Sequence, residues 1–173
     1  MGIKTISIGM MKPNKDDVIA WRGPILDRAL TQLLADVHWG DLDYLLLDLP
    51  PGTGDIAMSL GQKVPTAEVL VVTTPQQAAS EVAERAGTMA ALMNQKIIGV
   101  VENMSWLAFT APDTGKEYRI DLFGSGGGQE AADALSKRLG TEVPLLAQVP
   151  MDIELRKGGD EGDPIVTAHP ESP

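Results

Sequence analysis

Four short and nearly continuous apolar runs constrain the fold of this chain most strongly. They are YLLLDL (44–49), VLVVTT (69–74), IIGVV (97–101) and LLAQV (145–149). Strands that are apolar on both faces are typical of a parallel sheet covered by helices, whereas strands with one solvated face alternate apolar and polar residues. The segment IKTISIG (3–9) is a candidate for a further strand. We therefore expect a mostly parallel sheet built from these runs.

Segments with helical spacing separate the apolar runs. Apolar side chains recur every three or four residues in 24–34, in 77–93 and in 131–139. Strands that alternate with helices imply right-handed crossover connections, which place helices on the faces of the sheet. The expected fold class is therefore α/β, with three layers around a mostly parallel sheet. Residues 104–128 interrupt this alternation, and a hairpin is predicted near 116–123.

The predicted hairpin is followed by GSGGG (124–128). Backbone amides at a glycine-rich helix start can bind an anion. No lysine adjoins this run, and no tight strand–turn–helix spacing surrounds it. We therefore interpret it as a flexible connector rather than an anion site.

The composition limits the surfaces that the chain can offer. A formal net charge of −10 argues against a surface for nucleic acid or anionic membranes, because no basic stripe could offset it. The sequence has no cysteine, which excludes disulfides and thiolate metal ligands within it. Its longest apolar runs are strand-sized rather than membrane-spanning. We expect an acidic cytoplasmic α/β protein, and the length fits one domain.

Polar residues follow each of the four apolar runs. They are Asp48 after the first, 73–76 (TTPQ) after the second, Glu102 and Asn103 after the third, and 150–152 (PMD) after the fourth. The carboxyl ends of parallel strands meet at one edge of a sheet, and ligands of open α/β sheets bind there. A single strand-ending acid is a common turn former. Four polar strand ends together predict a nucleotide or phosphate site.

The sequence DLPPGTGD, from Asp48 to Asp55, is the most informative motif at this edge. A carboxylate at the end of a rigid strand can hold a magnesium ion directly or through water. Gly52 and Gly54 let backbone N–H groups approach a phosphate oxygen closely. Asp55 either takes part in the site or caps a helix over 56–62, and the sequence leaves both roles open.

Two further residues have two interpretations each. Asn103 offers an amide with a donor and an acceptor, which suits the edge of a purine, and it equally suits a turn that closes the strand. Asp152 after Pro150 either accepts a hydrogen bond from a base or ribose, or caps a short helix over 153–157. Neither residue is assigned to one role by the sequence pattern.

Six segments together carry a family resemblance. The sequence is similar to the Mrp family, a branch of the MinD-like phosphate-loop ATPases with a deviant Walker A motif that act as iron–sulfur cluster carriers. The similarity covers essentially the whole chain in order, and WRGP, DLPPGTGD and ENMS are its most specific motifs. The segments are VIAWRGPILDRAL (18–30), WGDLDYLLLDLPPGTGD (39–55), VVTTPQ (71–76), GVVENMSW (99–106), FGSGGG (123–128) and VPMDIELRKGGDEGDPIV (149–166).

The resemblance implies a P-loop NTPase fold and a role for each matching residue. Asp48 resembles the Walker B acid, which is catalytic and binds magnesium. Residues 50–55 resemble the second switch loop, which senses the γ-phosphate. Asn103 resembles the asparagine that reads adenine, and the turn at 150–152 flanks the base. The implied nucleotide-binding residues are Pro51, Gly52, Thr53, Gly54, Asn103, Pro150 and Asp152.

The resemblance also implies an activity and partners. Family members form homodimers whose ATP sites face the subunit interface. The implied function is binding and slow hydrolysis of ATP with magnesium, coupled to holding an iron–sulfur cluster. The implied recipients of the cluster are apo iron–sulfur proteins.

The sequence departs from the family pattern at two places. No GxxxxGK[ST] motif occurs in residues 1–173, so the lysine-bearing phosphate loop is missing from them. The CxxC pair that many members carry after ENMS is missing too, so this sequence supplies no iron–sulfur ligands. We expect residues 1–173 to be the C-terminal major part of a single P-loop NTPase domain, incomplete at the N-terminus and at the C-terminus. This chain alone should neither hydrolyse ATP nor bind it tightly.

Two other functions stay open at this point. A positioning ATPase related to MinD or ParA shares the fold, but it needs a membrane-seeking helix or a basic DNA-binding patch. A non-catalytic dimerisation module derived from the ATPase would have lost the phosphate loop. The retained Asp48 and switch loop speak against this second alternative.

Overall fold

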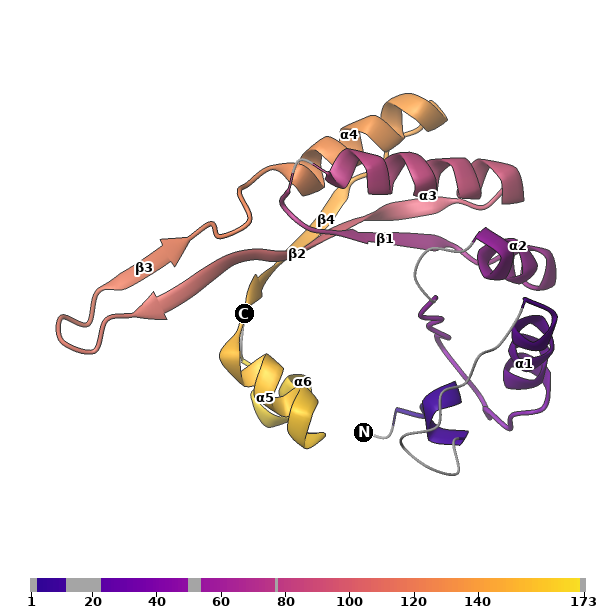
Figure 1. Cartoon of the computed structure of the whole chain (residues 1–173), viewed down its shortest axis with the longest axis horizontal. Helices are drawn as coiled ribbons and strands as arrows, with labels where there is room; N and C mark the ends of the chain where they lie inside the picture. The colour runs from indigo at the N-terminus through magenta and orange to yellow at the C-terminus, as the bar shows by residue number, and fades with distance from the viewer. Residues whose placement is uncertain (1–2, 12–22, 50–53, 77, 172–173) are drawn as a thin grey trace. The chain divides into compact units, whose positions relative to one another are not determined.

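The computed structural model describes four ranges of the chain: 3–11, 23–49, 54–76 and 78–171. The chain divides into two compact units, Met1–Thr66 and Ala67–Pro173. Figure 1 labels the helices and strands of both units. Among the described residues, no helix has the length and apolar character needed to cross a membrane.

The secondary structure described in the first unit is entirely helical. It contains a short 3-10 helix, η1 (Ile8–Met11), and two α-helices, α1 (Gly23–Ala35) and α2 (Gly54–Lys63). Helix α1 confirms the helix expected over 24–34. It packs against α2, and both helices contribute buried apolar side chains: Ala29, Ile56 and Leu60.

A carboxylate joins the two helices of the first unit. Asp27 on α1 accepts a hydrogen bond from the Ser59 hydroxyl on α2. It also pairs with Lys63, with 3.2 Å between Nζ and Oδ1. The Ser59 hydrogen bond, with that of Lys63 and its charge, lowers the pKa of Asp27, because each favours the ionised form. The Asp27 side chain is 47% exposed, so water screens this contact.

The structure corrects two strand predictions in the first unit. Residues 44–49 have no helix or strand, and 3–9 leads into η1 without forming a strand. Tyr44 and Leu46 are 87% and 91% exposed. A strand persists only where a neighbouring strand takes its backbone hydrogen bonds, and the described part of the first unit contains no strand. Asp48 therefore does not stand at the end of a strand.

The second unit is built on one sheet. Its four strands are β1 (Val69–Thr73), β2 (Ile97–Thr110), β3 (Glu117–Ile120) and β4 (Leu145–Met151). Strand β2 pairs in parallel with β1 and with β4, and antiparallel with β3. The apolar runs at 69–74, 97–101 and 145–149 therefore form strands as predicted. The α/β class with a mostly parallel sheet is confirmed.

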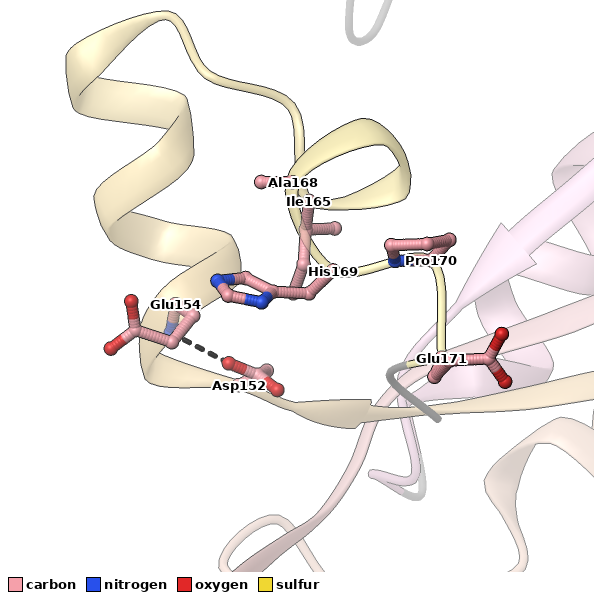
Figure 2. A pocket seen from close by; sticks show the side chains of 7 residues that line it. All are labelled: Asp152, Glu154, Ile165, Ala168, His169, Pro170 and Glu171. Atoms are coloured by element: carbon pink, nitrogen blue, oxygen red, sulfur yellow. Dashed lines mark hydrogen bonds between the residues drawn. The ribbon is translucent and has the colours of Figure 1, made fainter.

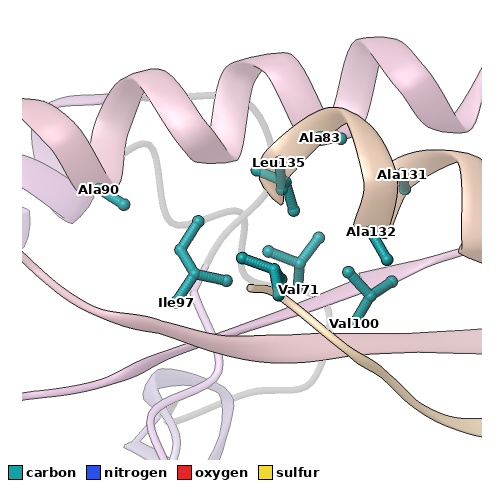
Figure 3. Packing of buried hydrophobic residues seen from close by; sticks show 9 residues of the cluster. Val71, Ala83, Ala90, Ile97, Val100, Ala131, Ala132 and Leu135 are labelled. Atoms are coloured by element: carbon teal, nitrogen blue, oxygen red, sulfur yellow. The ribbon is translucent and has the colours of Figure 1, made fainter. Parts of the chain in front are cut away.

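Helices α3 (Ala79–Met93) and α4 (Gly127–Leu139) lie on the same face of this sheet (Figure 1). They confirm the helices expected within 77–93 and 131–139, although α4 begins earlier than expected. Residues with positive φ end both helices. The core between helices and sheet is aliphatic and rich in alanine (Figure 3): Val71, Ala83, Ala90, Ile97, Val100, Ala131, Ala132, Leu135 and Val143.

Two parts of the second unit lie beyond the region that α3 and α4 cover: a hairpin and two C-terminal helices. Strand β2 continues beyond the helices and forms a hairpin with β3 (Figure 1). A hairpin was expected near 116–123, but it spans 107–120, because its first strand is the extension of β2. Phe109 and Tyr118 stack across it, with ring centroids 5.3 Å apart. After β4, the chain forms α5 (Ile153–Glu161) and α6 (Ile165–Ala168).

Candidate functional site

Polar residues at the ends of β1 and β4 lie beside polar residues of β2 in the second unit. Contrary to the sequence prediction, Glu102 and Asn103 do not follow the end of a strand, because β2 continues to Thr110. Thr73 lies opposite Glu102 in the β1–β2 pair. On the other side, Glu102 lies opposite Gln148, and Asn103 lies opposite Val149. Thr73 and Glu102 are 5% and 1% exposed. This edge of the sheet therefore contains a buried polar row beside Asn103.

Glu102 is the most buried polar residue of this row. Its carboxylate accepts a hydrogen bond from the backbone N–H of Gly128 and another from the side-chain amide of Gln148, both at 2.7 Å. Burying a carboxylate is costly unless hydrogen bonds satisfy it. These two bonds therefore tie β2 to the start of α4 and to β4. Sequence reasoning named Glu102 only as a strand end, and an acid directly after an apolar run was the only signal for its role.

The glycine-rich segment 124–128 belongs to this edge and is not a flexible connector. Its last two glycines form the first turn of α4 and are buried. A Cβ at Gly127 would stand 2.6 Å from backbone atoms of Pro75, and a Cβ at Gly128 would stand 2.7 Å from the Glu102 Cβ. Only glycine permits these approaches. Because the Gly128 amide binds the Glu102 carboxylate, the chain itself supplies the anion at this helix start.

Strand β2 is irregular directly after Asn103. Its pairing with β4 joins Asn103 to Val149 and then Leu107 to Met151, so β2 contains extra residues between these pairs. Such a β-bulge bends a strand and redirects its side chains. Met104 has a φ of +59°, in the left-handed region that residues other than glycine rarely adopt.

Two hydrogen bonds hold this Met104 bulge (residues 104–106). The Oδ1 atom of Asn103 accepts a hydrogen bond from the backbone N–H of Met104 at 2.9 Å. The hydroxyl of Ser105, a residue that is 3% exposed, donates to the backbone carbonyl of Glu102 at 3.0 Å. The turn that would close the strand at Asn103 is therefore not present, since β2 continues to Thr110. Asn103 instead holds a bulge within the strand through Oδ1, and its amide nitrogen takes no part in that hydrogen bond.

Asp152 caps α5, as one of its two interpretations predicted. Its Oδ1 atom accepts hydrogen bonds from the backbone N–H groups of Glu154 and Leu155, at 2.6 and 3.2 Å. Pro150, which precedes it, is buried at the end of β4. A cavity of about 450 Å³ opens beside Asp152 (Figure 2), and its three carboxylates do not suit a phosphate. The cavity is lined by Asp152, Glu154, Ile165, Ala168, His169, Pro170 and Glu171.

The other predicted site residues belong to the first unit. Asp48 is exposed there, and Gly54 is the first residue of α2. Asp55 lies within the first turn of α2 rather than ahead of a helix over 56–62. Three further predicted residues lie outside the described ranges: Pro51, Gly52 and Thr53.

Asp48 fits a magnesium ion in donor type. Magnesium prefers oxygen ligands, keeps several waters and is commonly bound through one or two carboxylates and phosphate oxygens. Among the described residues, no group of three or more His, Asp or Glu side chains could hold a metal ion by itself. Asp48 would therefore need further oxygen ligands, such as those of phosphate and water, to hold the ion. The sequence has no cysteine to offer an iron–sulfur cluster.

Comparison with known protein sequences identifies relatives along the whole chain. A family model described as ParA, NUBPL iron-transfer P-loop NTPase, matches residues 1–173. The iron-sulfur cluster carrier protein of Mycobacterium leprae (strain TN) is 57% identical over 171 residues, which cover 99% of this chain and 43% of that protein. The protein of the same name from Deinococcus radiodurans is 46% identical, over 99% of this chain and 45% of that protein. The chain thus spans less than half the length of these two relatives.

A solved structure agrees with this relationship. It is described as the nucleotide-binding protein in complex with ADP from Archaeoglobus fulgidus, with Co. It is 36% identical, with a TM-score of 0.62, and the match covers 80% of this chain and 53% of that chain. The Mrp resemblance of the motifs, the parallel α/β sheet and these matches agree, and the chain belongs to the ParA/NUBPL family of iron-transfer P-loop NTPases.

Proposed function

We propose that the protein containing this chain binds and hydrolyses ATP with magnesium, and that it carries iron–sulfur clusters to apo iron–sulfur proteins in the cytoplasm. A fold by itself does not set a function. The main support is the 36% identity to a structure described as nucleotide-binding and in complex with ADP. The carrier role is supported by the name of the relative that is 57% identical.

Each predicted site residue has a separate task in this proposal. Asp48 supplies an oxygen donor to magnesium, which neutralises phosphate charge when bound. The loop at 51–54 contacts phosphate through backbone N–H groups. Asn103 contacts the base, and Pro150 and Asp152 flank it. Asp152 uses its Oδ1 atom to cap α5, which leaves Oδ2 for a base or ribose hydroxyl.

Two parts of the activity depend on residues outside 1–173. The lysine-bearing phosphate loop is absent from these residues, and relatives of more than twice the length have room for one. Thiolate ligands for a cluster must also come from elsewhere in the protein or its partner. We propose that 1–173 is the major part of one nucleotide-binding domain, that this part alone is inactive, and that the whole protein acts as a homodimer.

The ATPase proposal is tested in the full-length protein by Asp48→Asn. This change keeps the size of the side chain but removes its charge, so steady-state hydrolysis should fall about a hundredfold because metal-assisted charge neutralisation is lost. Asp43→Asn, in the same exposed segment, is the matched control and should stay within about twofold of the wild type. Equal rates for the two variants would remove Asp48 from the catalytic machinery.

The carrier proposal needs its own measurement. The full-length protein is reconstituted with iron and sulfide, and the visible absorbance of a bound cluster is recorded. It is then mixed with an apo iron–sulfur enzyme whose recovered activity reports transfer. Recovery above that with free iron and sulfide is the expected result. A protein that hydrolyses ATP but never holds a cluster would keep the ATPase proposal and end the carrier proposal.

A further inference from the structure

We propose that the Met104 bulge orients the Asn103 amide and thereby sets a preference for adenine over guanine nucleotides. This inference rests on the proposed role of Asn103 in contacting the base. It goes further because it assigns base discrimination to the backbone conformation of residues 104–106. Met104 is a positioning residue in this proposal, since it acts through Asn103.

The first step is the orientation of the amide. The oxygen and nitrogen of an asparagine side chain are similar in shape, so either could face a given neighbour. The neighbour here is the backbone N–H of Met104, which donates to Asn103 at 2.9 Å. Only an oxygen can accept that bond, so Oδ1 faces the bulge and Nδ2 faces elsewhere. The oxygen keeps a second lone pair for another donor.

The second step is the match between this orientation and a purine. Adenine presents an acceptor, N7, beside an amino donor, and an asparagine amide pairs with both. Guanine presents the acceptor O6 where adenine has its amino group. An amide that is free to turn could adapt its donors to guanine. At Asn103 such a turn would place Nδ2 against the Met104 N–H, donor against donor, and lose the hydrogen bond that exists now.

The third step is the anchoring of the bulge itself. The Ser105 hydroxyl donates to the Glu102 carbonyl, and both residues are almost fully buried. The Glu102 carboxylate is in turn held by Gly128 and Gln148. The bulge is thus fixed to three elements of the second unit, β2, α4 and β4. Met104 is 41% exposed, so the inference rests on its backbone conformation rather than on packing of its side chain.

A pair of substitutions at Met104 separates the backbone from the side chain. Glycine adopts positive φ readily, whereas a β-branched residue is strongly disfavoured there. In the full-length protein, Met104→Gly should keep the wild-type ratio of ATP to GTP affinity within about twofold. Met104→Val should lower that ratio about tenfold by weakening ATP binding, because one good bidentate base contact is lost, while GTP affinity stays the same. Both affinities are measured by competition against a fluorescent ADP analogue.

A second variant covers the case in which Met104→Val fails to fold. Ser105→Ala removes the hydroxyl that anchors the bulge and leaves Asn103 and Met104 in place, and it should also lower the ATP to GTP ratio. Equal loss in the glycine and valine variants, or an unchanged ratio in both valine and alanine variants, would overturn the inference. A wild type that binds ATP and GTP equally would overturn it while the proposed function stands. A wild type that binds no nucleotide would overturn both.

Discussion

Asp27 in the first unit and Glu102 in the second each join neighbouring elements through a carboxylate, and they differ in burial. Asp27 links α1 to α2 with a side chain that is 47% exposed. Glu102 links β2 to α4 and β4 and is 1% exposed. Water can replace the partners of an exposed carboxylate at little cost, whereas loss of a buried one leaves its donors unsatisfied. The same type of contact should therefore contribute very differently to stability.

The largest effect is expected from Glu102→Ala. The substitution leaves the Gly128 N–H and the Gln148 amide without their acceptor, so the free energy of unfolding should fall by about 2–4 kcal/mol. Urea unfolding followed by far-ultraviolet circular dichroism measures it. Glu117→Ala, on the exposed strand β3, is the control and should change stability by no more than about 0.5 kcal/mol. A similar small change in the Glu102 and Glu117 variants would show that burial of the Glu102 carboxylate does not raise its contribution to stability.

An intermediate effect is expected from adding a methyl group where α4 meets the sheet edge. Gly127→Ala brings a Cβ to 2.6 Å from Pro75 backbone atoms, so α4 must shift away from the edge and stability should fall by about 1–3 kcal/mol. Gly159→Ala in α5 meets no atom within 4 Å and should stabilise the chain by about 0.5–1 kcal/mol. The same unfolding experiment gives both values. A neutral or stabilising Gly127→Ala variant would show that close packing at Gly127 is not needed.

The smallest effect is expected from Asp27→Asn, and it should appear in the dependence on pH. The folded pKa of Asp27 is lowered, so its ionised form stabilises the fold above the unfolded pKa of about 3.9. This contribution is lost as the pH falls through the folded pKa. The variant should therefore lose less stability than the wild type between neutral pH and about pH 3, as measured by thermal midpoints. Asp36→Asn, on an exposed residue nearby, should follow the wild type, and identical curves for all three would exclude the Asp27 contact.

Much of the second unit could be predicted from the sequence because its signals are local. The apolar runs at 69–74, 97–101 and 145–149 form strands whose neighbours lie in the same unit, and the patterns at 77–93 and 131–139 form helices. The run at 44–49 is also mostly apolar, but it has no neighbouring strand in the described part of its unit. A strand forms only beside another strand that pairs with its backbone, and the composition of one segment does not show whether such a strand is present.

The parts of the site that were missed depend on contacts between distant segments. Glu102 accepts a hydrogen bond from the backbone N–H of Gly128, so its role depends on where α4 packs and not on the residues next to it in the sequence. Gly127 and Gly128 are needed for close approach to Pro75 and Glu102, although a glycine-rich sequence also fits a flexible connector. The positive φ of Met104 has no sequence signal, because methionine disfavours that conformation. Asp48 and the loop after it were recognised by motif alone, and their role stays a prediction.

The alanine-rich core has a consequence for spectroscopy of this protein. The core cluster between α3, α4 and the sheet includes no aromatic residue among those described. The aromatic residues of the second unit, Trp106, Phe109, Tyr118 and Phe123, all lie in or next to the β2–β3 hairpin. Tryptophan and tyrosine signals of this unit therefore originate outside its core. Fluorescence of Trp106 would follow the opening of the hairpin, whereas signals from the peptide backbone would follow the melting of the core of this unit.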